Sequence, residues 1–201
     1  MQVSHSRYLA GIVSSLVAGL VLGATNIVEP SEYLVKLLLY ILILSAGFTI
    51  GGMWGERGLP SGREALSGVA LGLSVMAAGG LAGYAVSLVL GEDPRLATVI
   101  GLASGWYSLA GPLVALHDPV LGLVAFLANL LREILHISIY PVLAVRGWPC
   151  RGVSVGGATT MDTGLPVVVK FGGSRAALLA LSQGAIITMI APLAALSLLN
   201  G

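Results

Sequence analysis

Five polar side chains recur at helical spacing inside the otherwise apolar stretch Pro119–Val145. They are Asn129, Arg132, Glu133, His136 and Tyr140. These spacings place all five on one face of a helix. A charged side chain at the centre of a bilayer costs on the order of 2.5–3.5 kcal/mol, so this face is expected to look into a helix bundle or cavity. There the carboxylate either binds a cation or proton, or belongs to a structural ion-pair network that locks helices together.

A third costly charge, Asp162, lies in a Gly- and Thr-rich segment, 156–164, which also holds Thr159 and Thr160. An aspartate after a break can cap free backbone N–H groups and can also bind a cation. The charges of Arg132, Glu133 and Asp162 sum to −1. That total complements a basic amino acid, with two ammonium groups for the carboxylates and a carboxylate for the arginine or a half-helix N-terminus. A monovalent metal ion or a proton relay fits it equally.

Two segments, 98–116 and 152–171, are apolar at their ends but polar, Gly-rich and Pro-containing at their centres. Irregular backbone at membrane depth is tolerated only inside protein or beside a watery cavity, and paired interrupted segments indicate a transporter binding site. The candidate side chains of the first segment are Ser104, Trp106, Tyr107 and Ser108. Hydroxyls and aromatic faces suit a cation or an aliphatic stem, although the aromatic residues would equally pack at a membrane interface. His136 fits either proton coupling or a paired polar position.

The composition requires a membrane protein, because 56% of the residues are hydrophobic and only 9% are charged. A soluble domain typically carries about 25% charged residues. We expect an all-α polytopic fold in which residues 1–201 form a single transmembrane domain. Five stretches are long and apolar enough to span: Tyr8–Val28, Leu34–Met53, Ala65–Leu90, Pro119–Val145 and Ala176–Asn200.

The distribution of basic residues bears on the two interrupted segments. If both are re-entrant and the N-terminus is cytoplasmic, the residues inside are Arg7, Arg57, Arg63, Arg146, Arg151, Lys170 and Arg175, and only Lys36 and Arg95 lie outside. Full crossings would move Arg146 and Arg151 outside. The positive-inside rule therefore favours two opposed re-entrant elements, with the C-terminus outside, over broken crossing helices.

Several functional classes fit poorly. A net charge of +1 without a basic face disfavours nucleic acid as a partner. One cysteine and three dispersed histidines indicate no metal site, and we expect no cofactor. An intramembrane aspartyl protease would need a second membrane-embedded aspartate beside Asp162, so no enzyme is predicted. The alternatives that remain beside an amino-acid transporter are a cation/proton antiporter or channel, and a non-transporting assembly subunit.

Three motifs together resemble the LysO family of lysine exporters: Gly105-Trp106-Tyr107-Ser108, Asn129-Leu130-Leu131-Arg132-Glu133 and the segment 156–162. The resemblance extends from about Leu34 onward. It implies export of L-lysine and its analogue thialysine across the cytoplasmic membrane of a prokaryote, with proton antiport as the coupling. It also implies that two membrane-embedded acids, here Glu133 and Asp162, are central to translocation.

Single-chain members of that family are longer and have further N-terminal helices. The chain therefore resembles the larger part of a split member, which implies either a small membrane partner chain or a homodimer.

Overall fold

The computed structural model describes residues 62–200 and a few isolated helical positions before them. The expected spans Tyr8–Val28 and Leu34–Met53 lie outside the continuously described part. Within that part every regular element is a helix, which confirms the all-α expectation.

Three helices of the described part are long and apolar enough to cross a membrane: α3 (Gly62–Leu90), α6 (Pro119–Val145) and α8 (Leu165–Asn200). They correspond to the three expected spans in this region. The start of α6 follows from its sequence, because Asp118 accepts hydrogen bonds from the Val120 and Leu121 amides and Pro119 needs no partner at the first position. Gly173 interrupts α8 with a φ of 74°, so its crossing part begins after that residue.

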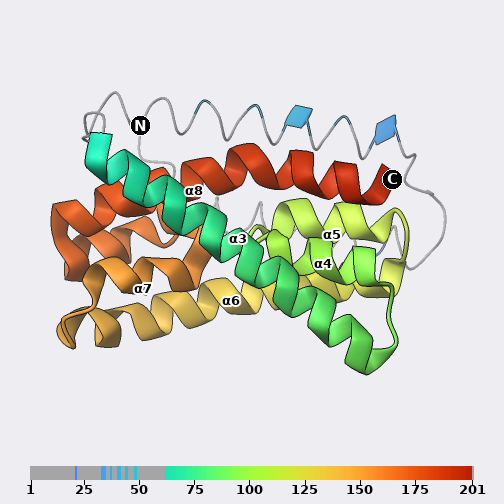
Figure 1. Cartoon of the computed structure of the whole chain (residues 1–201), viewed down its shortest axis with the longest axis horizontal. Coiled ribbons are helices and arrows are strands. Elements are labelled where there is room, and N and C mark those ends of the chain that lie inside the picture. Colours follow the sequence, from blue (N-terminus) through green and yellow to red (C-terminus); the bar gives the residue numbers. More distant parts are fainter. Residues whose placement is uncertain are drawn as a thin grey trace. The chain divides into compact units, whose positions relative to one another are not determined.

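The first interrupted segment forms a helix–break–helix hairpin, called hairpin 1, made of α4 (Pro94–Leu102) and α5 (Tyr107–Ala115). Helix α4 runs back along α3, where Gly79 lies against Gly101, and α5 runs along α6, where Gly122 lies against Ala115. Both ends of hairpin 1 therefore lie where α3 ends and α6 begins, as Figure 1 shows.

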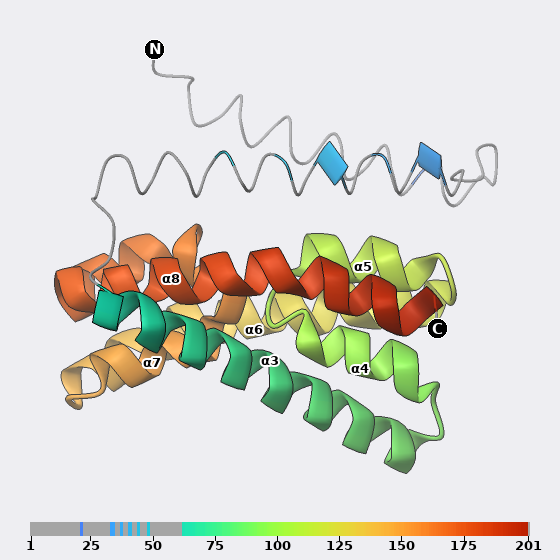
Figure 2. The same ribbon diagram turned by 45° about the horizontal axis from the view of Figure 1, so that its top comes forward.

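The second interrupted segment forms hairpin 2. It consists of α7 (Pro149–Gly156), the short 3₁₀ helix η1 (Gly157–Met161) and the opening turns of α8 as far as Gly172. Gly152 lies against Tyr140 and Gly156 against His136, so α7 runs antiparallel to α6. Hairpin 2 therefore starts from the opposite end of the bundle to hairpin 1 (Figure 2).

The two hairpin tips touch each other. The Ala158 amide donates a 2.9 Å hydrogen bond to the Ser104 carbonyl. Gly157 has a φ of 65°, and a side chain there would collide with Ser104. The part of the chain from α3 to hairpin 2 is thus two units of one long helix and one returning hairpin, running in opposite directions.

Glycine pairs at four-residue spacing allow close contact between helices, as membrane helices favour. Gly68 and Gly72 of α3 pack against Ser182 and Ile186 of α8, and Gly79 and Gly83 pack against Gly101 and Ala97 of α4.

We predict that Gly79→Ala destabilises the protein and that Gly80→Ala does not. A Cβ at Gly79 would collide with the Gly101 carbonyl, whereas one at Gly80 meets its nearest neighbours at 3.6 Å, an ordinary contact. Overpacking typically costs about 1–3 kcal/mol, and alanine otherwise favours a helix. Thermal unfolding in detergent measures the difference, and equal melting temperatures for the two variants would contradict the α3–α4 packing.

Candidate functional site

Asn129 of α6 holds the break in hairpin 1. Its side-chain oxygen accepts from the Gly105 amide at 2.7 Å, and its side-chain nitrogen donates to the Ile100 carbonyl at 3.1 Å. Both are groups that the interruption of the helix leaves without a regular partner. Asn129 is therefore an interhelical hydrogen-bonding residue, and its partners in hairpin 1 are backbone groups.

Arg132 performs the matching role for hairpin 2. Its Nε donates to the Val155 carbonyl at 2.8 Å and its Nη2 donates to the Ser154 carbonyl at 3.1 Å. These carbonyls end α7, where the helix dipole places partial negative charge that a cation stabilises. The partner of Arg132 is thus a helix C-terminus, and two of its N–H groups are already engaged.

His136 and Tyr140 lie inside hairpin 2. The Tyr140 hydroxyl donates to the Pro149 carbonyl at 2.9 Å, and the ring of His136 stacks edge-on against Tyr140 with centroids 5.3 Å apart. His136 is fully buried, and neither of its ring nitrogens has a hydrogen-bond partner in the described part of the chain. Gly156 and Gly164 enclose it, since a Cβ at either position would collide with the ring.

Glu133 differs from the other four polar residues on this face of α6, which form the polar stripe of the helix. The residue is 7% exposed, and its Oε2 is buried without a hydrogen-bond partner among the described residues. Its side chain interacts with that of Tyr107 in hairpin 1, and its charge is close enough to interact with that of Asp162. A buried carboxylate with an unused oxygen is poised to receive a cation or a proton.

Asp162 lies at the tip of hairpin 2, directly after η1, and is exposed. Its Oδ1 accepts from the Thr163 amide at 2.6 Å and from the Thr163 hydroxyl at 3.3 Å. The expected capping role is therefore met only locally, by the next residue and not by the first amides of α8. Asp162 and Glu133 come from different elements and lie within electrostatic range of each other.

The candidate residues of hairpin 1 divide between the break and the first turn of α5. Ser104 is fully buried in the left-handed region, with a φ of 51°, and its hydroxyl has no partner in the described part. Trp106 precedes α5 and is half-buried, as is Ser108. Tyr107 packs edge-on against Phe126 with ring centroids 5.4 Å apart.

Thr159 and Thr160 are buried and bind the backbone of their own hairpin. Their hydroxyls donate to the Gly156 carbonyl at 3.2 Å and the Gly157 carbonyl at 2.6 Å, respectively. Together with Arg132, they pair the carbonyls around the end of α7. Their observed contacts are structural, although both lie within a few residues of Asp162.

Gln183 of α8 is a functional candidate that sequence reasoning missed. It is fully buried, and its side-chain nitrogen donates to the carbonyls of Val153 at 3.2 Å and Gly157 at 3.0 Å, and approaches the Thr160 hydroxyl. The available signal was a single amide in the middle of an apolar spanning stretch, where polar side chains are costly. Gln183 therefore fixes hairpin 2 from the side opposite α6.

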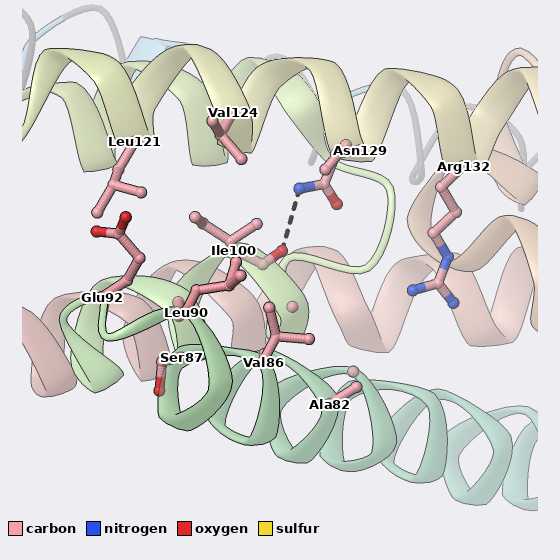
Figure 3. Close-up of a pocket in the computed structure, with 15 residues that line it drawn as sticks. Ala82, Val86, Ser87, Leu90, Glu92, Ile100, Leu121, Val124, Asn129 and Arg132 are labelled. Atoms are coloured by element: carbon pink, nitrogen blue, oxygen red, sulfur yellow. Dashed lines mark hydrogen bonds between the residues drawn. The ribbon is translucent and has the colours of Figure 1, made fainter.

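A groove of about 360 Å³ lies between α3, α4 and α6 (Figure 3). Asn129 and Arg132 line it near the hairpin tips, Glu92 lies at its other end, and most of its wall is apolar. Neither Glu133 nor Asp162 is among the described residues that line this groove.

Two other kinds of site do not fit the described residues. Residues 152–156 match the Gly-x-Ser-x-Gly pattern of a serine nucleophile, but Ser154 lies inside helix α7 and donates to the Arg151 carbonyl, without the strand-to-helix turn that such a nucleophile needs. Among the described residues, no group of three or more histidine, cysteine, aspartate or glutamate side chains could hold a metal ion.

Comparison with known proteins decides the family. A model described as Lysine exporter LysO matches residues 13–199. The chain belongs to the LysO family. The Lysine exporter LysO of Escherichia coli is 30% identical over 94% of this chain, and a Putative lysine exporter of Haemophilus influenzae is 33% identical over 44% of it.

The matched regions cover 62% and 46% of those two relatives, so the chain spans less than two thirds of the length of either. No solved structure matches the chain. Family membership and the three apolar helices together make this a multi-pass membrane protein of a transporter family, not of an enzyme class.

We predict that Gln183→Leu loosens hairpin 2. The substitution removes a buried donor, which costs about 1–3 kcal/mol. Because Cys150 is the single native cysteine, Ala158→Cys in a Cys150→Ser background places a thiol at a buried position of the tip, which a maleimide reaches only when the hairpin opens. The labelling rate should rise at least about fivefold. Thr188→Val, which removes only a 4.0 Å contact to the Met161 sulfur, is the control, and an unchanged rate in Gln183→Leu would contradict the role of Gln183.

Proposed function

We propose that the chain exports L-lysine across the cytoplasmic membrane of a prokaryote. The observation that carries the proposal is Glu133, a buried acid with an oxygen that no described residue binds, within electrostatic range of Asp162. The names of the two relatives support lysine as the substrate. Thialysine differs from lysine within the side chain only, so the same site would take it.

The two acids would divide the two ammonium groups of lysine between them. Tyr107, whose side chain interacts with Glu133, would shape the site around the ammonium and the aliphatic stem. The lysine carboxylate requires N–H donors. Arg132 retains N–H groups beyond the two that cap α7, and the first turn of α5 offers a helix N-terminus in the tip of hairpin 1.

Proton antiport follows from the same pair of acids. A carboxylate holds an ammonium group by charge, and protonation removes that charge and releases the cation. Export of lysine would then alternate with proton entry at Glu133 and Asp162. His136, whose ring nitrogens have no partner in the described part, lies beside Arg132 and would take part in the proton path.

The antiparallel arrangement of the two hairpins supports alternating access. We propose that both hairpins are re-entrant, that the N-terminus is inside, and that the C-terminus is outside. Inverted units of one helix and one hairpin that meet at a central site are a recurrent transporter design. The transporter would work as a homodimer or with a small membrane partner chain.

Lysine flux in proteoliposomes with an imposed pH gradient tests the proposal. The expected result is lysine-specific efflux that stops when the gradient is collapsed. A second arm of the experiment adds a small membrane protein encoded beside this chain. Flux of inorganic cations without lysine dependence would overturn the substrate assignment.

We predict that Glu133→Gln and Asp162→Asn each reduce lysine flux at least about tenfold, because a charge-assisted hydrogen bond contributes about 1.5–3 kcal/mol. Both variants should fold, because each replaces a carboxylate with an amide of nearly the same shape, whose oxygen can still accept the Thr163 bonds at Asp162 and the Tyr107 contact at Glu133. Glu92→Gln, in the loop after α3, is the charge-matched control and should transport normally. Normal flux in both site variants would contradict the role of the acid pair.

A further inference from the structure

A second pocket, of about 310 Å³, lies at the end of the bundle where α3 and α7 begin. It is remote from the hairpin tips, and none of the proposed translocation residues lines it. Its walls come from the first turns of α3, the start of α7 and the part of α8 that follows Gly173. The lining residues are Arg63, Glu64, Ser67, Cys150, Arg175 and Leu179.

Two arginines from different helices, Arg63 of α3 and Arg175 of α8, line this pocket. Neither the Arg63 nor the Arg175 guanidinium makes a hydrogen bond or ion pair with any described residue. Glu64 also lines the pocket, so the described lining residues carry two arginines and one carboxylate, a net positive charge. Arginine pairs are well suited to phosphate, because each guanidinium can donate two parallel hydrogen bonds to its oxygens.

The location adds a second reason for an anionic ligand. Arg146, Arg151 and Lys170 lie at the same end of the bundle, in the turn before α7, in α7 and before the Gly173 break. The opposite end carries the acidic caps Asp93 and Asp118. The positive-inside rule places the basic end at the cytoplasmic leaflet, where anionic phospholipids gather.

We propose that this pocket binds the phosphodiester headgroup of an anionic phospholipid. Arg63 and Arg175 hold the phosphate oxygens, and Ser67 faces the headgroup glycerol. The volume lies at the lower end of the range for ligand pockets, about 300–1,000 Å³, which suits a headgroup and not a whole lipid. The acyl chains would lie along the apolar outer surface of α3, where Leu66 is exposed.

Binding of short-chain phosphatidylglycerol to the detergent-solubilised full chain, followed by thermal shift, tests the proposal. Each arginine near an anionic headgroup contributes about a fivefold gain in affinity, so Arg63→Gln with Arg175→Gln should weaken binding about 25-fold. The pair Arg146→Gln with Arg151→Gln removes equal charge at the same end but outside the pocket, and should change the affinity less than about threefold. Melting temperatures without lipid verify that both double variants fold.

Two further ligands identify what the pocket takes. Short-chain phosphatidylcholine should bind at least about tenfold more weakly, because its choline ammonium meets the arginines. Inorganic phosphate should fail to displace phosphatidylglycerol at equal concentration. If both double variants weakened phosphatidylglycerol binding equally, the attraction would be general to this surface and the pocket assignment would be wrong. If inorganic phosphate bound as tightly as phosphatidylglycerol, the lipid assignment would be wrong. Neither outcome depends on whether the protein transports lysine.

Discussion

Two interruptions of helix in the interior of an apolar bundle require partners for the backbone groups that they expose. An unpaired peptide group away from water costs several kcal/mol, so the hairpins can exist only if neighbouring side chains pair with these groups. In hairpin 1 the partner is Asn129. In hairpin 2, Arg132, Thr159 and Gln183 donate to consecutive carbonyls from Val153 to Gly156. The polar stripe of α6 therefore has a structural role, because its side chains bind the interrupted backbone of both hairpins.

This constraint distinguishes the polar residues of α6 that bind backbone from Glu133, which does not. A structural network and a binding site were alternative interpretations of these five polar residues, and the contacts show a structural role for some of them. Asn129, Arg132 and Tyr140 bind backbone, and Glu133 keeps a carboxylate oxygen that no described residue uses. The hydrogen bonds from these side chains to the hairpin backbone also bring that oxygen within electrostatic range of Asp162, because they fix both hairpin tips against α6. Stability and the proposed transport chemistry thus depend on the same few contacts.

Much of the fold was predictable from the sequence, because apolar length and helix caps determine it. The bounds of α6 match the expected Pro119–Val145, and both interrupted segments are helix–break–helix hairpins. The partners of the polar residues were not predictable, since they depend on tertiary contacts between residues far apart in the chain. Nothing in the sequence near Arg132 indicated that it would cap α7, and Gln183 lies in an apolar run whose neighbours in space include Val153. The substrate-site assignments of Glu133 and Asp162 stay predictions.

The central claim is that an ammonium group of lysine binds to the buried side chain of Glu133. Dicyclohexylcarbodiimide reacts with protonated carboxyl groups in apolar surroundings, and peptide mass spectrometry locates the modified residue. In the detergent-solubilised full chain, we expect modification of Glu133 and its suppression by lysine, but not by norleucine, which lacks the second ammonium group. Modification of Glu133 at the same rate with and without saturating lysine would contradict the account.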